Sequence, residues 1–589
     1  MKTPLLFLAV ASLAPIAPVP SQSLADYVAA VKGDTLVVKD YYEMNRQPNS
    51  LSWVLLLDTV DVPATRVYEL KTNGFYPHYL TPQTIPNHPA VIVGSDPTIM
   101  VNNKDANASP PVICNAIAEV DPGIIGFEAR GDLTMKNCAL VPAGLDGGVD
   151  WLFASVPGSD LHLVFDNCIM ERTKWVFVAL LQAHCSLTFR NCYFVNMNGY
   201  PCRRYGGVFD CFAAQDSLLV ENCTHVMAQG SMYGLRTYPF GSVRINRNTF
   251  INCSGYTFLN LGFQNNISIT NNIFVNCNLH PLDGCRLSET GEGDVDMQPI
   301  GLVNVYPEGA DTVDPGRRRF LVQNNLVYWD PSLARCDSIL NANRINGSTC
   351  WESQAVIMNS RTREMFDDDA QYPYLVTDTW KTSLPHFIDP KDLCTTQAAN
   401  IKTFVIAAAE DTTYATLPDW SLLSTGQESF VHPDWPIPVD LSYSDPDLLT
   451  AGTGGFPIGD LNWFPARKAA WLAQRAAEYE EIDAAVHTGR LLTAVLDPGG
   501  PATDFQLQQN FPNPFNPNTT ISFSLAKPGF VTLKVYDLLG REVVTLFEGF
   551  KEPQTYSLKF DGTSLSSGVY FCRLTASGVS QTRKILLAK

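Results

Sequence analysis

The chain has 589 residues, 45% of them hydrophobic, which is enough for a large buried core and too long for one compact domain. Its formal net charge of −18 argues against nucleic acid and anionic membrane surfaces as binding partners. Fifteen cysteines leave at least one of them without a disulfide partner in the chain.

Residues 1–23, MKTPLLFLAVASLAPIAPVPSQS, have the pattern of a secretory signal peptide. Lys2 precedes an apolar stretch from Leu5, and small residues follow near Ser21 and Ser23. This stretch is too short to cross a membrane as a helix, and we find no other segment with the length and purity of a transmembrane span. The sequence therefore predicts an exported protein, soluble or attached to a surface.

Residues 24–132 contain strand-like pieces between turn-rich connectors. Three such pieces are TLVVKD, SWVLLLDTV and AVIVGSD. We interpret this region as the irregular beginning of the β structure that follows.

Between residues 133 and 327 one short phrase, apolar-x-apolar-x-Asn-(Cys or Asn)-x-apolar, occurs seven times. The first six copies follow one another at 24 to 31 residues, and a 53-residue gap before the last copy marks an insertion. The copies are LTMKNCAL from Leu133, LVFDNCIM from Leu163, LTFRNCYF from Leu187, LLVENCTH from Leu218, VRINRNTF from Val243, ISITNNIF from Ile267 and FLVQNNLV from Phe320. A strand-turn-strand unit of this length cannot bury its apolar face alone, so the copies are predicted to stack as a solenoid.

Alignment of the copies predicts which residues lie side by side. Two apolar columns, beginning at Leu133 and Met135, have the spacing of a strand with one buried face. The polar pair after them is predicted at a sharp turn, because Asn tolerates a left-handed backbone; Arg247 replaces the first Asn in the fifth copy. The second member of the pair gives the column Cys138, Cys168, Cys192, Cys223, Asn248, Asn272 and Asn325.

Coils of about 25 residues with room for three short strands resemble the right-handed parallel β-helix of the pectate-lyase-like families, which carry an internal asparagine ladder at such a turn. The resemblance implies an all-β fold, with residues 24–460 as a right-handed parallel β-helix whose first and last coils are irregular. On the outward face, four successive copies carry alternating charge, namely Lys136, Asp166, Arg190 and Glu221. We favour a solvated salt-bridge ladder there over a ligand site.

The cysteine column predicts stacked thiols. Neighbouring strands lie about 4.8 Å apart, and parallel side chains at this spacing hold their Cβ atoms farther apart than a disulfide prefers. The better disulfide candidates are two pairs in loop-rich sequence, Cys202 with Cys211 and Cys336 with Cys350.

After residue 330 the repeat decays into late irregular coils and long loops. Residues 461–490 predict a helix, with Pro465 near its first turn, Gly489 past its end and an apolar stripe that includes Tyr479 and Ile482. We expect this helix to cover an open sheet end or to pack on a loop. Residues 491–504 form a Pro/Gly linker.

Residues 505–589 predict a small Ig-like β-sandwich, because short alternating strands are separated by Pro, Gly and Asn turns. QNFPNPFNPNTTI, VYDLLGREV, SGVYFCRL and KILLAK resemble, in order and spacing, the C-terminal sorting domain, type A, of type IX secretion (Por secretion) cargo. The resemblance implies a bacterium of the Bacteroidota or a related group and passage across the outer membrane. Residues 505–589 would bind the type IX machinery, and the protein would be extracellular or at the outer-membrane surface.

The β-helix resemblance also implies where a substrate would bind. Pectate-lyase-like folds use the outward face of one strand column, here the third strand of each coil, in WLFASV, WVFVALL, GVFDCFAA and YTFLNLG. Lyases of this fold need a base and a cation or Arg that neutralises the uronate carboxylate. The candidates for these catalytic roles are Lys174, Arg203, Arg204 and Arg236. We favour solvated loop charges, because neither the arginine motifs of pectate lyases nor the aspartates of polygalacturonases occur at recognisable spacing.

Two further candidates have simpler explanations. The loop ETGEGDVDM could supply oxygen ligands for calcium from Glu289, Glu292, Asp294 and Asp296, but without the spacing of a calcium-loop motif a flexible acidic loop is favoured. His225 falls in an inward column of phenylalanines, which favours a buried neutral imidazole over a catalytic one.

Two functions remain open from the sequence. One is a non-catalytic β-helix at the cell surface or in the medium that binds extracellular polysaccharide, mediates adhesion or serves as a scaffold. The other is a polysaccharide lyase or glycoside hydrolase that acts in the same place. The first is favoured because a fold alone does not give a function and no catalytic constellation is evident.

Overall fold

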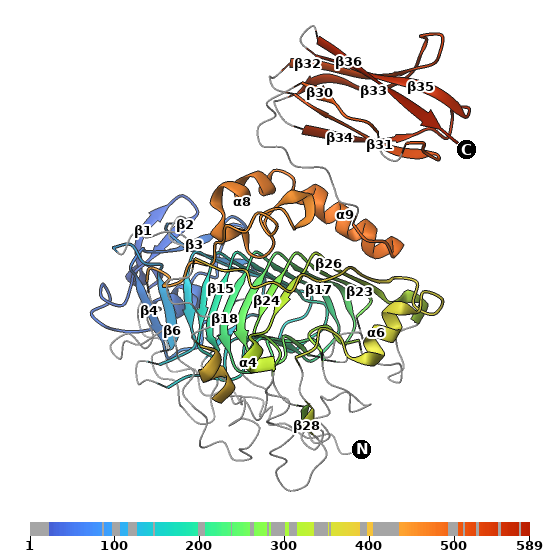
Figure 1. The fold of residues 1–589 in the computed structure, drawn as a ribbon. Coiled ribbons are helices and arrows are strands. Elements are labelled where there is room, and N and C mark those ends of the chain that lie inside the picture. The colour runs from blue at the N-terminus through green and yellow to red at the C-terminus, as the bar shows by residue number, and fades with distance from the viewer. Residues whose placement is uncertain are drawn as a thin grey trace. The chain divides into compact units, whose positions relative to one another are not determined.

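The computed structural model describes residues 23–84, 88–96, 107–115, 126–144, 148–197, 207–236, 238–259, 264–279, 282–283, 301–305, 315–334, 351–352, 355–388, 397–403, 435–492, 505–510, 513–525, 529–551, 555–576 and 579–589. The chain divides into two compact units, Met1–Ala494 and Val495–Lys589 (Figure 1). Each unit is described by itself.

Most strands of the first unit belong to three long sheets, which we call A, B and C. Sheet A contains β1 (Val28–Lys32), β2 (Thr35–Val38), β3 (Val67–Leu70), β5 (Ala90–Gly94), β8 (Leu133–Lys136), β11 (His162–Asp166), β14 (Ser186–Arg190), β17 (Gln215–Glu221), β20 (Phe240–Asn246), β23 (Asn266–Thr270), β26 (Arg319–Gln323) and β29 (Leu375–Thr377). Sheet B contains β4 (Phe75–His78), β6 (Val112–Asn115), β9 (Ala139–Val141), β12 (Ile169–Glu171), β15 (Tyr193–Met197), β18 (Thr224–Ala228), β21 (Thr249–Cys253), β24 (Ile273–Val275) and β27 (Leu326–Tyr328). Sheet C contains β7 (Phe127–Glu128), β10 (Leu152–Val156), β13 (Val176–Leu180), β16 (Gly207–Cys211), β19 (Tyr233–Gly234) and β22 (Phe258–Leu259).

The chain visits the three sheets in turn. For example, β8 in sheet A is followed by β9 in sheet B and β10 in sheet C, and the chain then returns to sheet A as β11. Each such passage, called a coil below, adds one strand to each sheet, and neighbouring strands are parallel except β1 and β2. The expectation of a β-rich chain with long parallel sheets is confirmed.

The register of sheet A places the repeats as their alignment predicts. Leu133 pairs with Leu163, which pairs in turn with Leu187, and the column continues through Leu218, Val243, Ile267 and Phe320. Both apolar columns of the repeats are buried in one continuous core. The repeat therefore predicted both the pairing and the buried face.

The turn from sheet A to sheet B depends on one residue per coil with a positive φ. The first member of each polar pair has φ between 50° and 60°, namely Asn137, Asn167, Asn191, Asn222, Arg247, Asn271 and Asn324. This conformation is sterically strained for a non-glycine residue, and the strain is smaller for Asn than for most others. The predicted left-handed turn is confirmed in all seven copies.

The next residue of each pair points into the core and links neighbouring coils. The Oδ1 of Asn272 accepts hydrogen bonds from the backbone N–H and Nδ2 of Asn248, at 2.9 and 3.0 Å. Asn325 accepts the same pair of bonds from Asn272, both at 3.0 Å. Cys223 donates its backbone N–H to Asn248 Oδ1 at 2.9 Å, so the asparagine ladder runs directly into the thiol column.

The thiols of this column are free and buried, as predicted, and burial raises the pKa of Cys168 and Cys223 well above the usual value. Cys211 is also free and buried, which contradicts the candidate disulfide with Cys202. Cys211 sits inside β16 with its Sγ 3.3 Å from the Leu235 carbonyl oxygen, in the core rather than in a loop. Cys202, Cys336 and Cys350 lie outside the described residues.

A ring stack fills the core beside sheet B. The imidazole of His225 lies between Phe194 and Phe250, with ring centroids 4.6 and 4.1 Å away, and Phe274 continues the stack at 5.0 Å from Phe250. Its Nε2 lies 2.7 Å from the Tyr233 hydroxyl. Burial lowers the pKa of His225 well below its usual value, so the predicted neutral, hydrogen-bonded histidine is confirmed.

The N-terminal end of the coils is closed by helices. α1 (Leu24–Tyr27) and α2 (Ser50–Leu57) pack together, and Leu51, Val54 and Leu55 of α2 join the core. The prediction of a strand in SWVLLLDTV is therefore wrong. A short apolar run fits a strand or a buried helix equally well, and the i, i+3, i+4 spacing of these three residues suits a helix at the end of a core.

The remaining described elements follow the decay of the repeat. They include α4 (Pro331–Ala334), α6 (Ser360–Asp367), the 3-10 helices Pro315–Arg317, Thr453–Gly455 and Leu461–Trp463, and the antiparallel pair β25 (Leu282–Asp283) and β28 (Trp351–Glu352). The predicted helix of residues 461–490 is two helices, α8 (Pro465–Leu472) and α9 (Arg475–Thr488). Pro465 and the left-handed Gly489 stand at the ends as predicted.

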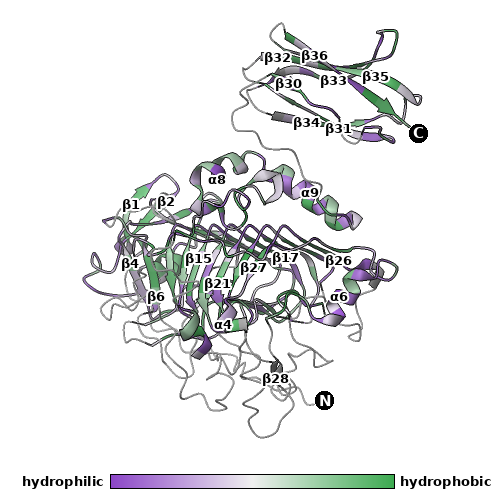
Figure 2. Cartoon of the chain, viewed as in Figure 1, coloured by the Kyte–Doolittle hydropathy of each residue, from purple (hydrophilic) through white to green (hydrophobic). Residues whose placement is uncertain are grey.

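α9 packs on the outer face of sheet A at β23 and β26, rather than over a sheet end or a loop as expected (Figure 1). Leu321 of β26 contacts Ile482, Ala485 and Val486. Figure 2 shows hydrophilic and hydrophobic residues interspersed along α9. A small apolar seam of this kind leaves much of the contact to polar groups.

The polar contact centres on Arg247, the residue that breaks the repeat. Its guanidinium is fully buried and binds both carboxylate oxygens of Glu478 in α9, at 2.9 and 2.6 Å. It also donates to the carbonyl oxygens of Thr453 and Pro457, at 2.7 and 3.1 Å. Trp471 of α8 donates its Nε1 to Glu478 at 2.8 Å. Trp471 and Glu478 are seven residues apart, about two helical turns, and both face the arginine.

The outward charge ladder is only partly solvated. Arg190 binds Asp166 at 2.8 Å, and although burial raises the pKa of Asp166, this arginine holds it below the usual value. Glu221 is fully buried and binds Arg475 of α9 at 2.7 Å. The predicted salt-bridge ladder is thus confirmed at Asp166, but at Glu221 it is a docking contact for α9 because the helix excludes solvent there.

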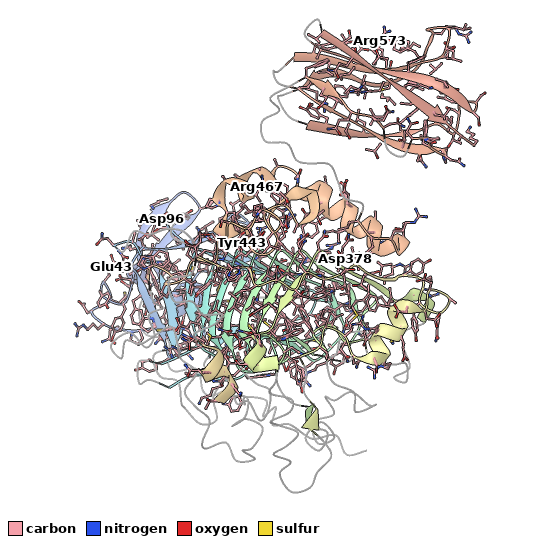
Figure 3. The ribbon with its side chains drawn as sticks, in the orientation of Figure 1. Glu43, Asp96, Asp378, Tyr443, Arg467 and Arg573 are labelled. Carbon is pink, nitrogen blue, oxygen red and sulfur yellow. The ribbon has the colours of Figure 1, made fainter. Side chains whose placement is uncertain are left out.

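Residues 435–464 cover part of sheet B. Ile251, Ile273 and Leu326 of sheet B share an apolar cluster with Leu441 and Trp463. Tyr443, labelled in Figure 3, donates its hydroxyl to the Ile458 carbonyl oxygen at 2.6 Å. This bond links two parts of the covering segment to each other. The outer faces of sheets A and B are therefore both packed by later parts of the chain.

The second unit contains two antiparallel sheets with one core. β30 (Gln506–Leu507), β31 (Asn518–Ser524) and β34 (Thr555–Asp561) form one sheet. β33 (Glu542–Lys551), β32 (Gly529–Tyr536), β35 (Gly568–Ala576) and β36 (Val579–Leu587) form the other. Phe523 of the first sheet and Val535 and Leu574 of the second belong to one buried cluster. Residues 1–22 and 493–504, within the predicted signal and linker, lie outside the described residues.

Two substitutions test the register of the ladder. Cys192→Asn should keep or raise the thermal midpoint, because the amide can donate to the Phe165 carbonyl oxygen, which Cys192 Sγ now contacts at 3.4 Å. Phe189→Asp should destabilise the first unit by several kcal/mol, because it buries a carboxylate without a partner in the apolar column. Thermal melting of both variants decides the point, and equal midpoints would refute the register.

A second pair of variants tests the docking of α9. Glu478→Ala leaves the buried Arg247 without its counter-charge and should cost about 3–5 kcal/mol in the free energy of unfolding of the first unit. Asp483→Ala is the matched control, because its pair with Arg244 is partly exposed and should cost less than about 1 kcal/mol. Urea denaturation of the two variants should show this order; the reverse order would contradict the assignment.

Candidate functional site

Sheet C contains the four segments expected to face a substrate. WLFASV, WVFVALL, GVFDCFAA and YTFLNLG contain β10, β13, β16 and β22, and the structure adds β7 and β19 between or beside them. Phe153 and Phe177 point into the core with ring centroids 6.1 Å apart. Leu152, Val176 and Ala179 form a separate small cluster on the other face. The outer face of sheet C therefore has an apolar patch on β10 and β13.

Two tryptophans stand at the entry to this face. Trp151 and Trp175 directly precede the paired residues Leu152 and Val176, so they occupy equivalent positions on adjacent coils. The Trp175 N–H donates to the Trp151 carbonyl oxygen at 3.0 Å, and Trp151 keeps 38% of its surface exposed. Asp150 fixes the start of this segment, because it accepts hydrogen bonds from Asn115 Nδ2 and the Trp151 N–H, both at 2.7 Å.

A carboxylate is held beside the tryptophans. Asp210 on β16 accepts two hydrogen bonds from Arg236, at 2.6 and 2.7 Å, and one from Trp175 Nε1 at 3.3 Å. The Arg236 guanidinium lies 4.6 Å from the ring centroid of Phe212, which meets the Trp175 ring edge-on at 5.9 Å. Gly234 makes room for the carboxylate, because a Cβ there would lie 3.1 Å from Asp210 Oδ1.

This cluster corrects one expectation about the basic residues. Arg236 is not a solvated loop charge: its side chain is only 25% exposed and forms a bidentate pair with Asp210, whose side chain is 9% exposed. Lys174 lies at the entry to β13, half-buried, between Thr173 and Trp175, and its N–H donates to the Asp150 carbonyl oxygen at 3.0 Å. Arg203, Arg204, Glu289, Glu292, Asp294 and Asp296 lie outside the described residues.

The sequence analysis missed Asp150, Trp151, Trp175 and Asp210. The available signal was the recurrence of Trp at the same place in WLFASV and WVFVALL, which the columns of the polar-pair repeat did not include. Asp210 could not be paired with Arg236 from spacing, since β17, β18 and β19 with their turns lie between them. The structure thus places one candidate, Arg236, in a cluster with residues that had not been considered.

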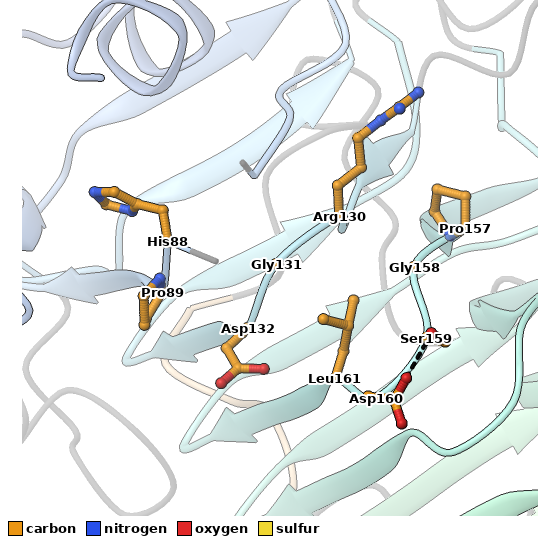
Figure 4. A pocket seen from close by; sticks show the side chains of 10 residues that line it. All are labelled: His88, Pro89, Arg130, Gly131, Asp132, Pro157, Gly158, Ser159, Asp160 and Leu161. Atoms are coloured by element: carbon orange, nitrogen blue, oxygen red, sulfur yellow. Dashed lines mark hydrogen bonds between the residues drawn. The ribbon is translucent and has the colours of Figure 1, made fainter. Parts of the chain in front are cut away.

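A pocket of about 690 Å³ lies at the other end of β10, where sheet C turns into sheet A (Figure 4). Most of its polar side chains already bind their neighbours, although the buried Nε2 of His88 has no hydrogen-bond partner among the described residues. Asp132 accepts the His162 N–H at 2.8 Å, the Ser159 hydroxyl donates to Asp160 at 2.6 Å, and Arg130 pairs with Glu128 at 2.6 Å. We therefore place the candidate site at the tryptophans and Asp210.

The described residues contain no group of three or more His, Cys, Asp or Glu side chains placed to hold a metal ion. No helix in the same part of the chain has the length and apolar character needed to cross a membrane.

Comparison with known proteins bears on the second unit. Residues 509–588 match the protein family described as the secretion system C-terminal sorting domain. The second unit is a sorting domain. It indicates export by type IX secretion to a secreted or cell-surface location, and it implies interaction with the type IX machinery. No curated protein and no solved structure matches the chain, and no pectate-lyase-like family matches it either.

The Asp210–Arg236 pair predicts a loss of stability on substitution. Arg236→Ala should lower the free energy of unfolding of the first unit by about 3–5 kcal/mol, because Asp210 stays largely buried without its counter-charge. Arg130→Ala is the control, since Arg130 is 50% exposed and should contribute less than about 1 kcal/mol. Urea denaturation measures both, and a similar small effect for the two variants would show that Arg236 is a surface charge after all.

Proposed function

We propose that the protein is a cell-surface or secreted glycan-binding protein, adhesive or scaffolding in role, that type IX secretion exports. In this proposal residues 24–460 form a right-handed parallel β-helix, and glycan binds on the outer face of sheet C. The exposed Trp151 beside Trp175 carries the proposal. Aromatic rings offer a large rigid apolar surface with a polar edge, which suits the alternating apolar and hydroxylated faces of a sugar.

The polar part of the site also supports glycan binding. Asp210, with Arg236 and Trp175 Nε1 around it, places an oriented carboxylate next to the rings. A binding site of this kind combines an aromatic and apolar lining with few, well-placed polar groups. The separation of the tryptophans by one coil, about 4.8 Å, matches neighbouring strands and lets both rings meet one chain.

A polysaccharide lyase or hydrolase is the less favoured alternative. A lyase needs a cation free to neutralise the uronate carboxylate, but the Arg236 guanidinium already forms two hydrogen bonds to Asp210. Lys174 would then have to act without it as the base. We therefore place binding before catalysis.

Tryptophan substitutions test the proposal. Trp151→Ala and Trp175→Ala should each weaken binding at least about tenfold to whichever of a panel of neutral and uronate polysaccharides binds the full chain, because each removes a ring from the contact. Tyr42→Ala is the matched control, since Tyr42 is an exposed aromatic residue, at 57%, far from sheet C in sequence.

The measurement is affinity electrophoresis or calorimetry, with and without calcium, together with assays for unsaturated and reducing ends. Binding that survives both tryptophan substitutions would refute the site. Release of cleaved products that Lys174→Ala abolishes, with the fold intact, would replace the binding proposal with the lyase alternative.

A further inference from the structure

Charge is divided sharply between the two parts of the chain. From residue 505 onward there are nine Lys or Arg and five Asp or Glu, whereas the preceding residues contain 32 basic and 54 acidic ones. The last 28 residues contain no acidic residue at all. Their four cations are Arg573, Arg583, Lys584 and Lys589. A basic domain on a strongly acidic protein points to an acidic partner for that domain.

Two of these cations are used inside the domain. Arg583 donates its Nε to the Leu507 carbonyl oxygen at 2.8 Å. Lys589 donates its Nζ to the carbonyl oxygens of Thr563 and Leu565, both at 2.6 Å. They hold the strand ends together.

The other two cations, Arg573 and Lys584, stand on the solvent side of the four-stranded sheet. Arg573, labelled in Figure 3, alternates with the buried Cys572 and Leu574, and Lys584 pairs across the strands with Phe571. Arg573 lies 5.0 Å above the Tyr536 ring and donates to the Thr582 hydroxyl at 3.4 Å. No carboxylate in the described part of the sorting domain pairs with Arg573 or Lys584, and both are exposed.

Apolar side chains adjoin these cations. Phe571 lies directly opposite Tyr536 on the neighbouring strand, and both rings are half-buried. The turn after Tyr536 presents Leu538 and Leu539 to solvent, at 69% and 77% exposure. This turn is ordered, because Asp537 accepts the N–H groups of Leu539 and Arg541 at 2.9 Å.

We propose that the sorting domain has a docking face that binds an acidic protein surface of the type IX machinery. The face consists of Tyr536, Leu538, Leu539, Phe571, Arg573 and Lys584. The partner surface would carry an apolar recess that receives the two leucines. Aromatic residues and arginine are enriched at protein interfaces, and two leucines on an ordered turn dock with little loss of conformational entropy. An acidic surface would attract the sorting domain and repel the rest of the chain, so the domain arrives first. This inference rests on the export role of the sorting domain and is independent of glycan binding.

Charge reversal in the full chain tests the docking face. Arg573→Glu with Lys584→Glu should lower the amount at the cell surface and in the medium at least about tenfold, with accumulation in the periplasm, because like charges repel across the interface. Arg573→Lys with Lys584→Arg keeps the charges and should export normally. Lys551→Glu is the matched control, since Lys551 lies over the Phe547 and Tyr556 rings outside the face. Thermal melting of the purified variants checks that the domain stays folded.

A chain that ends at residue 494 separates failure of this inference from failure of the export role. Export of that truncated chain would show that the sorting domain is not needed for export. If truncation stops export but the doubly reversed variant is exported normally, the docking face is wrong. Flotation of the full chain with anionic phospholipid vesicles, lost in the same variant, would assign the face to lipid and overturn the proposal for a protein partner.

The leucines are tested in the same assay. Leu538→Asn with Leu539→Asn should also reduce export at least about tenfold, because exposed apolar anchors carry much of the energy of an interface. Val579→Asn is the control, since Val579 is an exposed apolar residue, at 53%, in β36 away from the turn. Equal export of the leucine variant and its control would remove the leucines from the face.

Discussion

The left-handed residue at each turn from sheet A to sheet B is the constraint on which the first unit depends. In all seven repeat copies it places the end of the sheet A strand and the start of the sheet B strand at the same position in the coil. Because the turn repeats at one position, the residue after it always points inward, and the thiols and amides there fall into one column. Asn suits both members of the pair, since it tolerates the left-handed backbone and its amide satisfies the buried polar groups of the next coil.

The exception to this rule explains the covering helices. Arg247 accepts the same backbone conformation, with φ of 60°, although its side chain brings no local compensation of the kind that Asn offers. Its guanidinium supplies instead the buried charge that Glu478 and two carbonyl oxygens satisfy. A departure from the repeat therefore marks one of the coils on which α8 and α9 dock. Asn246, the last residue of β20 and the neighbour of Arg247 in sequence, donates to the same carboxylate at 2.9 Å.

Prediction from the sequence succeeded where residues of one type have the same structural role in every repeat. The pairs from Leu133 to Phe320 and the turn at Asn137 could be read because the constraint repeats. The strand expected in SWVLLLDTV was wrong because a short apolar run at the end of a core does not reveal whether its period is that of a strand or of a helix. The contact between Asp210 and Arg236 could not be predicted, because a contact between neighbouring coils at sheet C depends on the lengths of the turns between them. These lengths vary from coil to coil. The sequence did not reveal a second series of left-handed residues, at or near the ends of the sheet B strands, since its members share no single residue type. They are Arg172, Asn196, Met227, Asn252 and Asn276.

The packing of sheets A and B bears on where a ligand could bind. The outer face of a sheet can meet a partner only where no later part of the chain already lies on it. α9 occupies the outer face of sheet A around Leu321, and residues 435–464 occupy that of sheet B around Ile251 and Ile273. Trp151 of sheet C keeps more than a third of its surface exposed, although burial of an aromatic ring is favourable. An exposed ring next to a second tryptophan and an oriented carboxylate contributes little to folding, which is why the proposed binding site lies on sheet C.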